Sequence, residues 1–475
     1  MGSAGTGSAG TGSAGTGSAG TDSEAVPGAP APSALALPAS FKWGVSTAAY
    51  QIEGAAAEDG RGPSIWDLFG RQAGRIANGD TGDVACDHYH RYREDVALMR
   101  RLGAQVYRFS VAWPRVLPQG RGQANSLGLD FYDRLIDEVL RNGIEPWLCL
   151  YHWDLPQALD DLGGWQNRDI ALWFADYAAL VARRYGDRVR HFATFNEPNV
   201  CTLFGYGMGW NAPGIANRRS FLQAAHHVNL AHGEAVRTLR ALAPGALLGA
   251  IYNRQICLPI SAAPQDAVAA GILDACWNRL YADPQCLAEY PPELAEGLQE
   301  FVQPGDMARI AQPIDWLGLN HYCPIYARAD QGPLGFAWAD APTDGALTGV
   351  GWRIDPDAFR NEVIATHRRY KLPIYITENG YGAHETLDEA GGVNDGGRIA
   401  YLALYTKALA EAVASGADVR GYFLWSLLDN LEWGAGYANR FGIVYVDYPT
   451  QRRVPKASFD WFAELIRAQQ HGDHA

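Results

Sequence analysis

The 475-residue chain lacks the features that would assign it to a membrane or a nucleic acid. It contains no run of 18 apolar residues, so no helical membrane span is predicted. Positive charge is in deficit, because 39 Lys and Arg face 52 Asp and Glu, which gives a net charge of −13. So acidic a chain repels phosphate backbones and anionic lipids, and nucleic acid and membrane are therefore poor partners. A neutral substrate is favoured.

Cysteine is scarce and unpaired. The seven cysteines occur singly, without a Cys-x-x-Cys pair, and their odd number disfavours a disulfide framework and favours a reducing, cytoplasmic compartment. His88 and His90 have a spacing that suggests a metal pair, but residues two apart at a helix start do not share a face. We interpret them as surface or capping histidines, and His226 and His227 as helix packing. No metal or cofactor is predicted.

The first residues do not resemble a folded segment. Residues 2–21 are four copies of Gly-Ser-Ala-Gly-Thr, and a proline-rich stretch continues them to residue 38. They lack the basic start and apolar middle of a signal peptide, and they bury too little surface to fold. We interpret residues 1–38 as a disordered leader or tag and residues 39–470 as one domain. A leader that replaced a natural signal peptide would overturn the cytoplasmic prediction.

Short apolar segments alternate with helical ones from residue 41 onward. Apolar residues recur every three or four positions in the helical segments, as in Tyr89, Tyr92, Val96, Met99 and Leu102, and in Ile399, Leu402, Thr406, Leu409 and Val413. Eight segments read as parallel strands that are buried on both faces: 42–47, 105–111, 144–151, 189–196, 246–252, 314–320, 373–378 and 419–426.

Eight strand–helix units predict an α/β fold, a single (β/α)8 TIM barrel. The alternative, an open doubly wound sheet, would require a glycine-rich phosphate loop after the first strand, and residues 46–54 are not one. The stretches 252–312 and 321–356 exceed ordinary barrel connections, and we expect these long loops to wall a deep active-site pocket. Fifteen Trp and 23 Tyr suit either sugar stacking or a large core, and composition alone does not decide between them.

Two glutamates end two separate predicted strands. Glu197 closes Phe192-Ala-Thr-Phe-Asn-Glu-Pro198, and Glu378 closes Ile374-Tyr-Ile-Thr-Glu-Asn-Gly380. A carboxylate directly after an apolar strand is costly unless it faces a site, and the fourth and seventh strands should lie on opposite sides of the barrel mouth. Two facing carboxylates can cleave one glycosidic bond: one protonates the leaving oxygen, and the other attacks the sugar carbon or activates water. A structural ion pair is the alternative for either glutamate alone.

With these motifs the chain resembles glycoside hydrolase family 1, the β-glucosidase family, over about residues 39–468. Four motifs occur in the family's order: Tyr151-His-Trp-Asp-Leu-Pro156, Thr194-Phe-Asn-Glu-Pro198, Tyr375-Ile-Thr-Glu-Asn-Gly380 and Asn430-Leu-Glu-Trp433. The resemblance implies that Glu197 is the general acid/base, Glu378 the nucleophile, and that Arg108, Asn196 and Tyr322 support them. It implies that sugar contacts come from Gln51, His152, Asn196, Asn320, Tyr322, Trp352, Trp425, Glu432, Trp433 and Phe441.

The chemistry of the Glu197–Glu378 pair and the residue at position 432 refine this prediction. Glu197 must be protonated in the working enzyme, so we expect burial and the charge of Glu378 to raise its pKa. Relatives that act on 6-phosphorylated sugars usually carry Ser where this chain has Glu432, whose carboxylate would repel phosphate, and Asn439 stands where a lysine is common. Unphosphorylated sugars are therefore favoured. Asn199, where many relatives have Trp, is expected to weaken stacking of the leaving group.

The predicted function is retaining hydrolysis of terminal β-D-glucosyl residues from glucosides or oligosaccharides such as cellobiose. The alternatives are a β-galactosidase, a β-fucosidase or a transglycosidase of the same family, and a sugar-binding barrel without catalysis, for which the loss of one glutamate would be expected.

Overall fold

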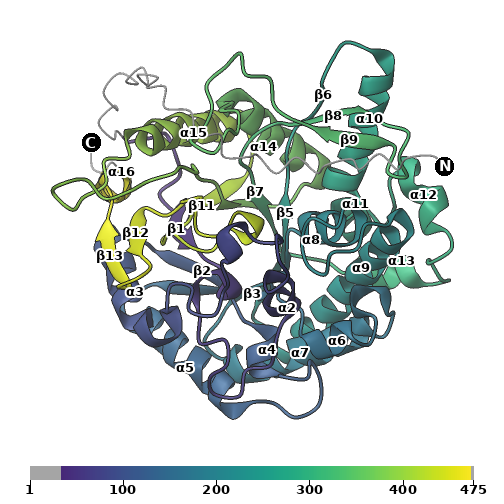
Figure 1. Ribbon diagram of the computed structural model, residues 1–475, viewed down its shortest axis with the longest axis horizontal. Coiled ribbons are helices and arrows are strands. Elements are labelled where there is room, and N and C mark those ends of the chain that lie inside the picture. Colours follow the sequence, from purple (N-terminus) through teal and green to yellow (C-terminus); the bar gives the residue numbers. More distant parts are fainter. Residues whose placement is uncertain (1–33, 472–475) are drawn as a thin grey trace, which may run out of the picture.

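The computed structural model describes residues 34–471, and their central feature is a closed barrel of eight parallel strands (Figure 1). All eight predicted strands are confirmed to within two residues, and the barrel prediction is confirmed with them. In order around the barrel the strands are β1 (Lys42–Ser46), β11 (Val419–Trp425), β10 (Ile374–Glu378), β7 (Trp316–Asn320), β5 (Leu247–Asn253), β4 (His191–Asn196), β3 (Glu145–Tyr151) and β2 (Val106–Ser110).

Long helices surround the barrel and bury their apolar faces against it (Figure 1). The predicted stripe of α3 is buried throughout, whereas that of α15 is buried except for half-buried Val413. Gly103, at a φ of 81°, ends α3 in the left-handed conformation that glycine adopts without strain. The outer helices are α3 (His88–Leu102), α5 (Ser126–Arg141), α7 (Ile170–Tyr185), α9 (Arg218–Leu242), α14 (Pro356–Tyr370), α15 (Gly396–Ala414) and α16 (Ala457–His471).

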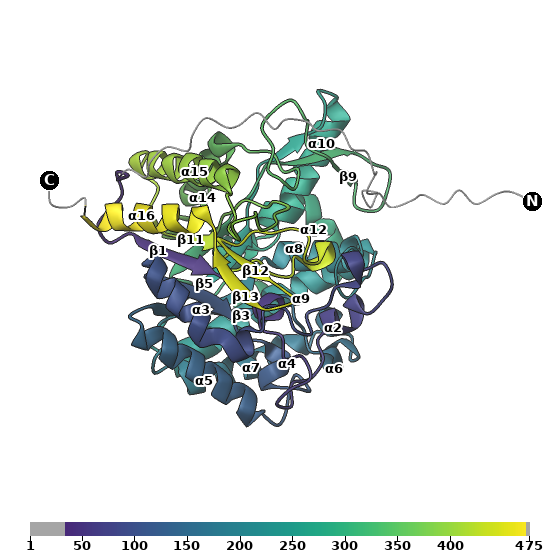
Figure 2. The same cartoon turned by 60° about the vertical axis from the view of Figure 1, so that its left-hand side comes forward.

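Short elements occupy the connections at the carboxyl ends of the strands. The two long loops contribute a three-stranded sheet of β6 (Cys257–Pro259), β8 (Ile325–Ala329) and β9 (Phe336–Ala339), which packs beside α10 (Pro264–Asp274) in Figures 1 and 2. A hairpin of β12 (Val444–Asp447) and β13 (Arg452–Pro455) leads into α16. The remaining short helices are α1 (Ala49–Ile52), α2 (Ile65–Gly70), α4 (Trp113–Val116), α6 (Gln157–Asp160), α8 (Pro198–Thr202), α11 (Ala282–Leu287), α12 (Pro292–Leu298) and α13 (Asp306–Ile310), with helical turns η1 (Ala77–Gly79), η2 (Gly164–Gln166), η3 (Leu203–Gly207), η4 (Ala275–Arg279) and η5 (Trp433–Ala435).

Large side chains fill the floor of the barrel and close it below the site. Trp147 contacts the rings of Trp316, Tyr375 and Phe423 at centroid distances of 5.1, 4.7 and 5.0 Å. Gly249 permits this packing, because a Cβ there would lie 2.4 Å from the Trp316 ring. The barrel is therefore a packed core, and a ligand can enter only at the end where the strands finish.

Three expectations change. His88 is not a surface or capping residue: its ring is buried, and Nδ1 lies 2.8 Å from Asp95, which Arg453 also binds. Strands β4 and β10 are not opposite, since only β5 and β7 separate them on one side. Most of the predicted leader lies outside the described residues, but Leu35 and Leu37 pack against the core. Within residues 34–471 no helix is long and apolar enough to cross a membrane.

Candidate active site

A cavity of about 710 Å³ opens at the carboxyl end of the barrel, where both glutamates lie. Its walls include residues from both predicted long loops, which confirms that these loops wall the pocket. Nine of the predicted site residues line it directly: His152, Glu197, Tyr322, Trp352, Glu378, Trp425, Glu432, Trp433 and Phe441. The other four, Gln51, Arg108, Asn196 and Asn320, are buried behind these and reach them through hydrogen bonds or adjacent backbone.

Glu197 stands at the end of β4 in a left-handed backbone conformation, with φ 47° and ψ 59°. A non-glycine residue is uncommon there, and such conformations cluster at functional sites. Its Oε1 accepts hydrogen bonds from the amide nitrogens of Asn253 at 2.9 Å and Asn320 at 2.7 Å. Burial, followed by the charge of Glu378, raises the pKa of Glu197 to about 8, as its expected role requires.

Glu378 stands at the end of β10 in different surroundings. The guanidinium of Arg108 donates to its Oε1 at 2.5 Å, and the hydroxyl of Tyr322 donates to its Oε2 at 2.7 Å. Burial raises the pKa of Glu378, while the positive charge of Arg108 opposes that rise most strongly. Because only Glu378 has a cation against its carboxylate, it is the first of the pair to ionise.

One polar network joins the two carboxylates. Arg108, which binds Glu378, also donates to Asn196 Oδ1 at 2.5 Å. Asn320 donates to that same oxygen at 3.0 Å and to Glu197 Oε1 at 2.7 Å. The two acids therefore face one cavity across a shared set of neutral amides and a single arginine, an arrangement that can hold one carboxyl protonated beside one ionised carboxylate.

The inner end of the cavity holds buried polar atoms that face no protein partner. His152 Nε2 accepts from the amide of Asn196 at 3.1 Å, which leaves the ring proton on Nδ1, and burial holds the pKa of His152 well below its usual range. Gln51 donates to Asn430 and to the Leu431 carbonyl at 2.9 and 2.8 Å. Within residues 34–471, His152 Nδ1 and Gln51 Oε1 have no hydrogen-bond partner although both are buried. Such atoms fit a ligand rich in hydroxyl groups.

Glu432 completes this inner end beside two tryptophans. Trp425 donates its Nε1 proton to Glu432 Oε1 at 3.2 Å, and burial raises the pKa of Glu432 to about 8. The His152 ring lies nearly parallel to those of Trp425 and Trp433, with interplanar angles of 19° and 17°. The result is a polar recess with flat aromatic faces, which suits the hydroxyls and apolar C–H face of one sugar ring.

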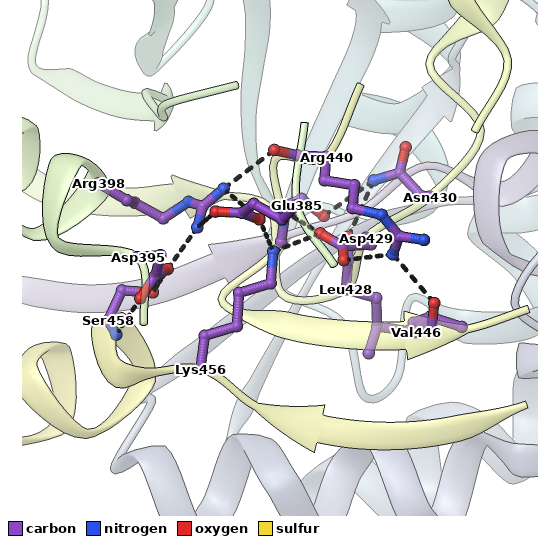
Figure 3. Close-up of polar contacts among 12 residues, drawn as sticks. Glu385, Asp395, Arg398, Leu428, Asp429, Asn430, Arg440, Val446, Lys456 and Ser458 are labelled. Atoms are coloured by element: carbon purple, nitrogen blue, oxygen red, sulfur yellow. Dashed lines mark hydrogen bonds and ion pairs between the residues drawn. The ribbon is translucent and has the colours of Figure 1, made fainter. Parts of the chain in front are cut away.

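A charge network, drawn in Figure 3, includes Asp429 and Arg440, which lie on either side of Glu432 in the chain. The ammonium of Lys456 lies 2.5 Å from Glu385 and 2.7 Å from Asp429, and no part of its side chain is exposed. The second oxygen of Asp429 binds Arg440 at 2.8 Å. Because Asp429 and Arg440 lie at the two ends of the loop that carries Glu432, the network fixes this loop on both sides of that residue.

The same network reaches the segment that follows Glu378 (Figure 3). Arg398 binds Glu385 at 2.7 Å, pairs with Asp395, and donates to the carbonyl of Arg440 at 3.0 Å. Asp395 in turn accepts from the backbone N–H of Ser458 at the start of α16 at 2.8 Å. Three cations and three anions thus tie α15, α16 and both loops together, and none of them was predicted as a functional residue.

The outer end of the cavity is aromatic. Phe204 and Trp210 come from the stretch after α8, and Trp277 and Trp338 from the two long loops. Neighbouring rings in this cluster lie 5.1–6.4 Å apart. Trp210 remains 50% exposed, as an aromatic surface at the mouth of a cavity would be. The sequence analysis predicted the loops but none of these four rings.

Asn199 does not project into the pocket as a weakened stacking partner. Its side chain is buried, and its amide donates to the carbonyl of Asn253 at 2.9 Å. Asn253 and Gln255, which line the cavity, were also missed. Their position directly after a predicted barrel strand was the available signal, because strand ends carry the active site in this fold.

Comparison of the sequence with known proteins finds a matching family and similar proteins. The model for "Glycosyl hydrolase family 1" matches residues 34–471. Beta-glucosidase A of Thermotoga maritima is 41% identical over 438 residues, which cover 90% of this chain and 97% of that protein. A "Bifunctional beta-D-glucosidase/beta-D-fucosidase" of Bifidobacterium breve is 44% identical, over 90% of this chain and 98% of that one.

Solved structures agree with these sequence relatives. The psychrophilic beta-glucosidase BglU from Micrococcus antarcticus superposes with a TM-score of 0.88 at 45% identity, covering 92% of this chain and 98% of that one. The family 1 b-glucosidase from Thermotoga maritima gives a TM-score of 0.87 at 40% identity, with coverages of 91% and 98%. The fold is therefore shared with these proteins over nearly their whole length.

Proposed function

This chain belongs to glycosyl hydrolase family 1, and from that premise we propose that it is a retaining β-glucosidase. It releases terminal, non-reducing β-D-glucosyl residues from glucosides or oligosaccharides. The observation that carries the proposal is the pair of buried carboxyl groups in one cavity, of which only Glu378 has a cation against its carboxylate.

The proposed reaction uses the two groups in sequence. Glu197, protonated, gives its proton to the glycosidic oxygen while Glu378 attacks the anomeric carbon, so the C–O bond to the leaving group breaks as a glycosyl–Glu378 ester forms. Glu197, now ionised, takes a proton from water, and the water oxygen displaces Glu378. Two inversions at one carbon give net retention. Arg108 and Tyr322 hold Glu378 in its ionised form and fix the oxygen that attacks.

The inner end supplies sugar recognition in this proposal. Gln51, His152 and Asn196 bind the 2- and 3-hydroxyls, and Glu432 accepts from the 4- and 6-hydroxyls. Trp425 forms the stacking floor, and Phe441 lies beside carbon 6. The remaining proposed contacts are with Asn320, Tyr322, Trp352 and Trp433. The carboxylate of Glu432 favours neutral hydroxyls over phosphate at position 6, because like charges repel.

The nucleophile assignment is tested with Glu378→Gly, an activated aryl β-glucoside and sodium azide. We expect the variant to lose hydrolysis and azide to restore turnover, with α-glucosyl azide as the product, because the small anion enters from the face that the carboxylate has left. Glu362→Gly, at a buried carboxylate that pairs with Arg254 away from the cavity, is the control and should keep the wild-type product. Unchanged hydrolysis by Glu378→Gly would refute the assignment.

A second activity, on β-fucosides, is favoured by one specific observation, the 44% identity to the bifunctional Bifidobacterium enzyme. Glucose, galactose and fucose differ only at carbons 4 and 6, where Glu432 and Phe441 are proposed to bind. A panel of nitrophenyl glycosides measures this directly through kcat/KM. Turnover of the glucoside alone would exclude the second activity. We also propose a cytoplasmic location, because all seven cysteines are free thiols.

A further inference from the structure

We propose that Asn253, the last residue of β5, and Gln255, two positions later, are positioning residues that select the oxygen of Glu197 that carries the catalytic proton. They form a one-way chain of side-chain amides from the segment that holds Tyr322 to the carboxyl group of Glu197. The inference rests on the proposed role of Glu197 as general acid/base and extends it to a specific atom.

The direction of the chain is set at Gln255. Its Oε1 accepts from the backbone N–H groups of Tyr322 and Cys323 at 3.4 and 3.3 Å, and a backbone N–H can only donate. The amide of Gln255 therefore has one orientation, with Nε2 turned toward Asn253. Gln255 Nε2 donates to Asn253 Oδ1 at 2.7 Å.

Asn253 passes this direction on to Glu197. Its Oδ1 accepts from Gln255 and also from the indole Nε1 of Trp277 at 3.3 Å, so two donors hold the oxygen away from the carboxyl group. Its nitrogen is left to face Glu197 and donates to Oε1 at 2.9 Å. Trp277 belongs to the aromatic outer end of the cavity, so this end of the cavity also fixes the amide of Asn253.

Asn320 reaches the same oxygen from the other side. Thr377 donates to Asn320 Oδ1 at 2.6 Å, which leaves the Asn320 nitrogen to donate to Glu197 Oε1 at 2.7 Å. An oxygen that accepts two N–H groups is a poor site for a proton, since a hydroxyl there would meet two donors. Within residues 34–471 both hydrogen bonds to the Glu197 carboxyl group end on Oε1, and none reaches Oε2. The acid form therefore carries its proton on Oε2.

Disrupting this chain of amides should impair acid catalysis by Glu197 more than nucleophilic attack by Glu378. Without the Gln255 donor, only the longer bond from Trp277, at 3.3 Å, holds the Asn253 oxygen. The amide can then rotate and present that oxygen to Glu197, which attracts the proton to Oε1 and away from the leaving group. Substrates whose leaving group needs protonation should suffer, whereas an already stable anion such as 2,4-dinitrophenolate should depart almost as well.

The pH profile reports the same change. Each N–H donor to a carboxylate stabilises its ionised form, so removing one raises the pKa of Glu197 and moves the basic limb of kcat/KM to higher pH. The charged or titratable groups that act on Glu197 come from several elements: Glu378 from β10, Arg108 from β2, Tyr322 after β7 and Cys201 from α8. Neither variant proposed below alters any of these groups.

The test uses the full-length enzyme with Gln255→Met, which keeps the length of the side chain and removes its amide, and Asn253→Ala as a second variant. We measure kcat/KM against pH for phenyl and 2,4-dinitrophenyl β-glucosides. The expected result is a loss of about tenfold or more for the phenyl substrate, a loss within about twofold for the dinitrophenyl substrate, and a basic limb at higher pH. Gln285→Met is the matched control, because this equally buried glutamine binds Tyr252 and Asn229 outside the cavity. It should change neither the substrate ratio nor the limb.

Equal losses of kcat/KM on both substrates, with the basic limb of the pH profile unchanged, would overturn the inference. The same changes in substrate ratio and basic limb in Gln285→Met would also overturn it. Thermal melting of each variant identifies one that fails to fold, and the other then decides. Glu197→Ala, measured in parallel, separates this inference from its premise. If Glu197→Ala loses both substrates equally, the acid/base assignment itself is wrong; if it spares only the dinitrophenyl substrate while Gln255→Met does not, the amide chain alone is wrong.

Discussion

The two ends of the cavity differ in their chemistry, since the inner end is polar and the outer end is aromatic. At the inner end, Gln51 and His152 are buried and Glu432 is half-buried, and all three are fixed by hydrogen bonds or by the charge network behind them. At the outer end, Trp210 and Trp338 are carried by connecting segments and offer partly exposed rings. A site that buries unpaired polar atoms rejects a ligand that lacks the matching hydroxyl, whereas an aromatic wall discriminates weakly among apolar groups. The enzyme should therefore be strict toward the sugar and tolerant toward the leaving group.

The largest expected effect is a loss of folding stability, caused by a change in the charge network that supports the inner end. Lys456→Met removes the cation between Glu385 and Asp429 and should destabilise the protein by about 3 kcal/mol, since an uncompensated buried charge is costly. Urea unfolding measures this, with Arg420→Met as control, because Arg420 pairs with Asp418 at the surface and should cost about 1 kcal/mol or less. Equal losses in the two variants would mean that the network does not hold the inner end.

A smaller effect is expected when the inner end itself is changed. Glu432→Ser deletes the acceptor proposed for the 4- and 6-hydroxyls and should lower kcat/KM for glucosides by about 100-fold, the equivalent of two lost hydrogen bonds to a charged group. The loss should be smaller for a β-xyloside, which has no 6-hydroxymethyl group. An equal loss on both sugars would contradict the contact proposed for carbon 6.

The pH profile sharpens the comparison within the catalytic pair. The pKa of Glu197 is raised to about 8, so the active, protonated form is present below that pH and is lost as the pH rises through it. We expect kcat/KM to fall by about tenfold per pH unit above about 8, because acid catalysis requires the proton that Glu197 carries. A basic limb near the ordinary carboxyl pKa would show that Glu197 is ionised in the free enzyme.

The smallest effect is expected at the outer end. Trp338→Ala removes one ring from the aromatic cluster and should raise KM for naphthyl or octyl β-glucosides by about 2- to 10-fold, the range for one aromatic contact. Methyl β-glucoside does not reach this wall and serves as the control substrate. A similar rise in KM for methyl β-glucoside would place Trp338 in the folding of the loop rather than in binding.

The catalytic pair could be predicted from the sequence because it sits where strands end, whereas the sugar contacts of the inner end were predicted from the resemblance to the family. Continuous apolar runs located the eight strands, and Glu197 and Glu378 stood out as charges directly after them. The outer end could not, because Trp277 and Trp338 lie in loops whose path follows no periodicity. Such loops are placed by tertiary contacts, here by pairing of β8 with β9 and packing on α10.

Buried ion pairs are hidden in a sequence for a related reason. His88 reads as a surface residue at a helix start, yet its partner Asp95 is buried with it and shared with Arg453, more than 350 positions along the chain. Lys456 and Glu385 pair across 71 positions. Charged residues predict exposure until a partner is known, and only the tertiary structure supplies the partner.

The most direct test of the central claim is to trap the glycosyl-enzyme. A 2-deoxy-2-fluoro-β-D-glucoside with a good leaving group slows the second step, and mass spectrometry of the intact protein followed by peptide mapping locates the sugar. We predict one fluoroglucosyl group per chain, attached to the peptide that contains Glu378. A label on another residue, or full turnover to an inverted α-anomer without any label, would contradict the account.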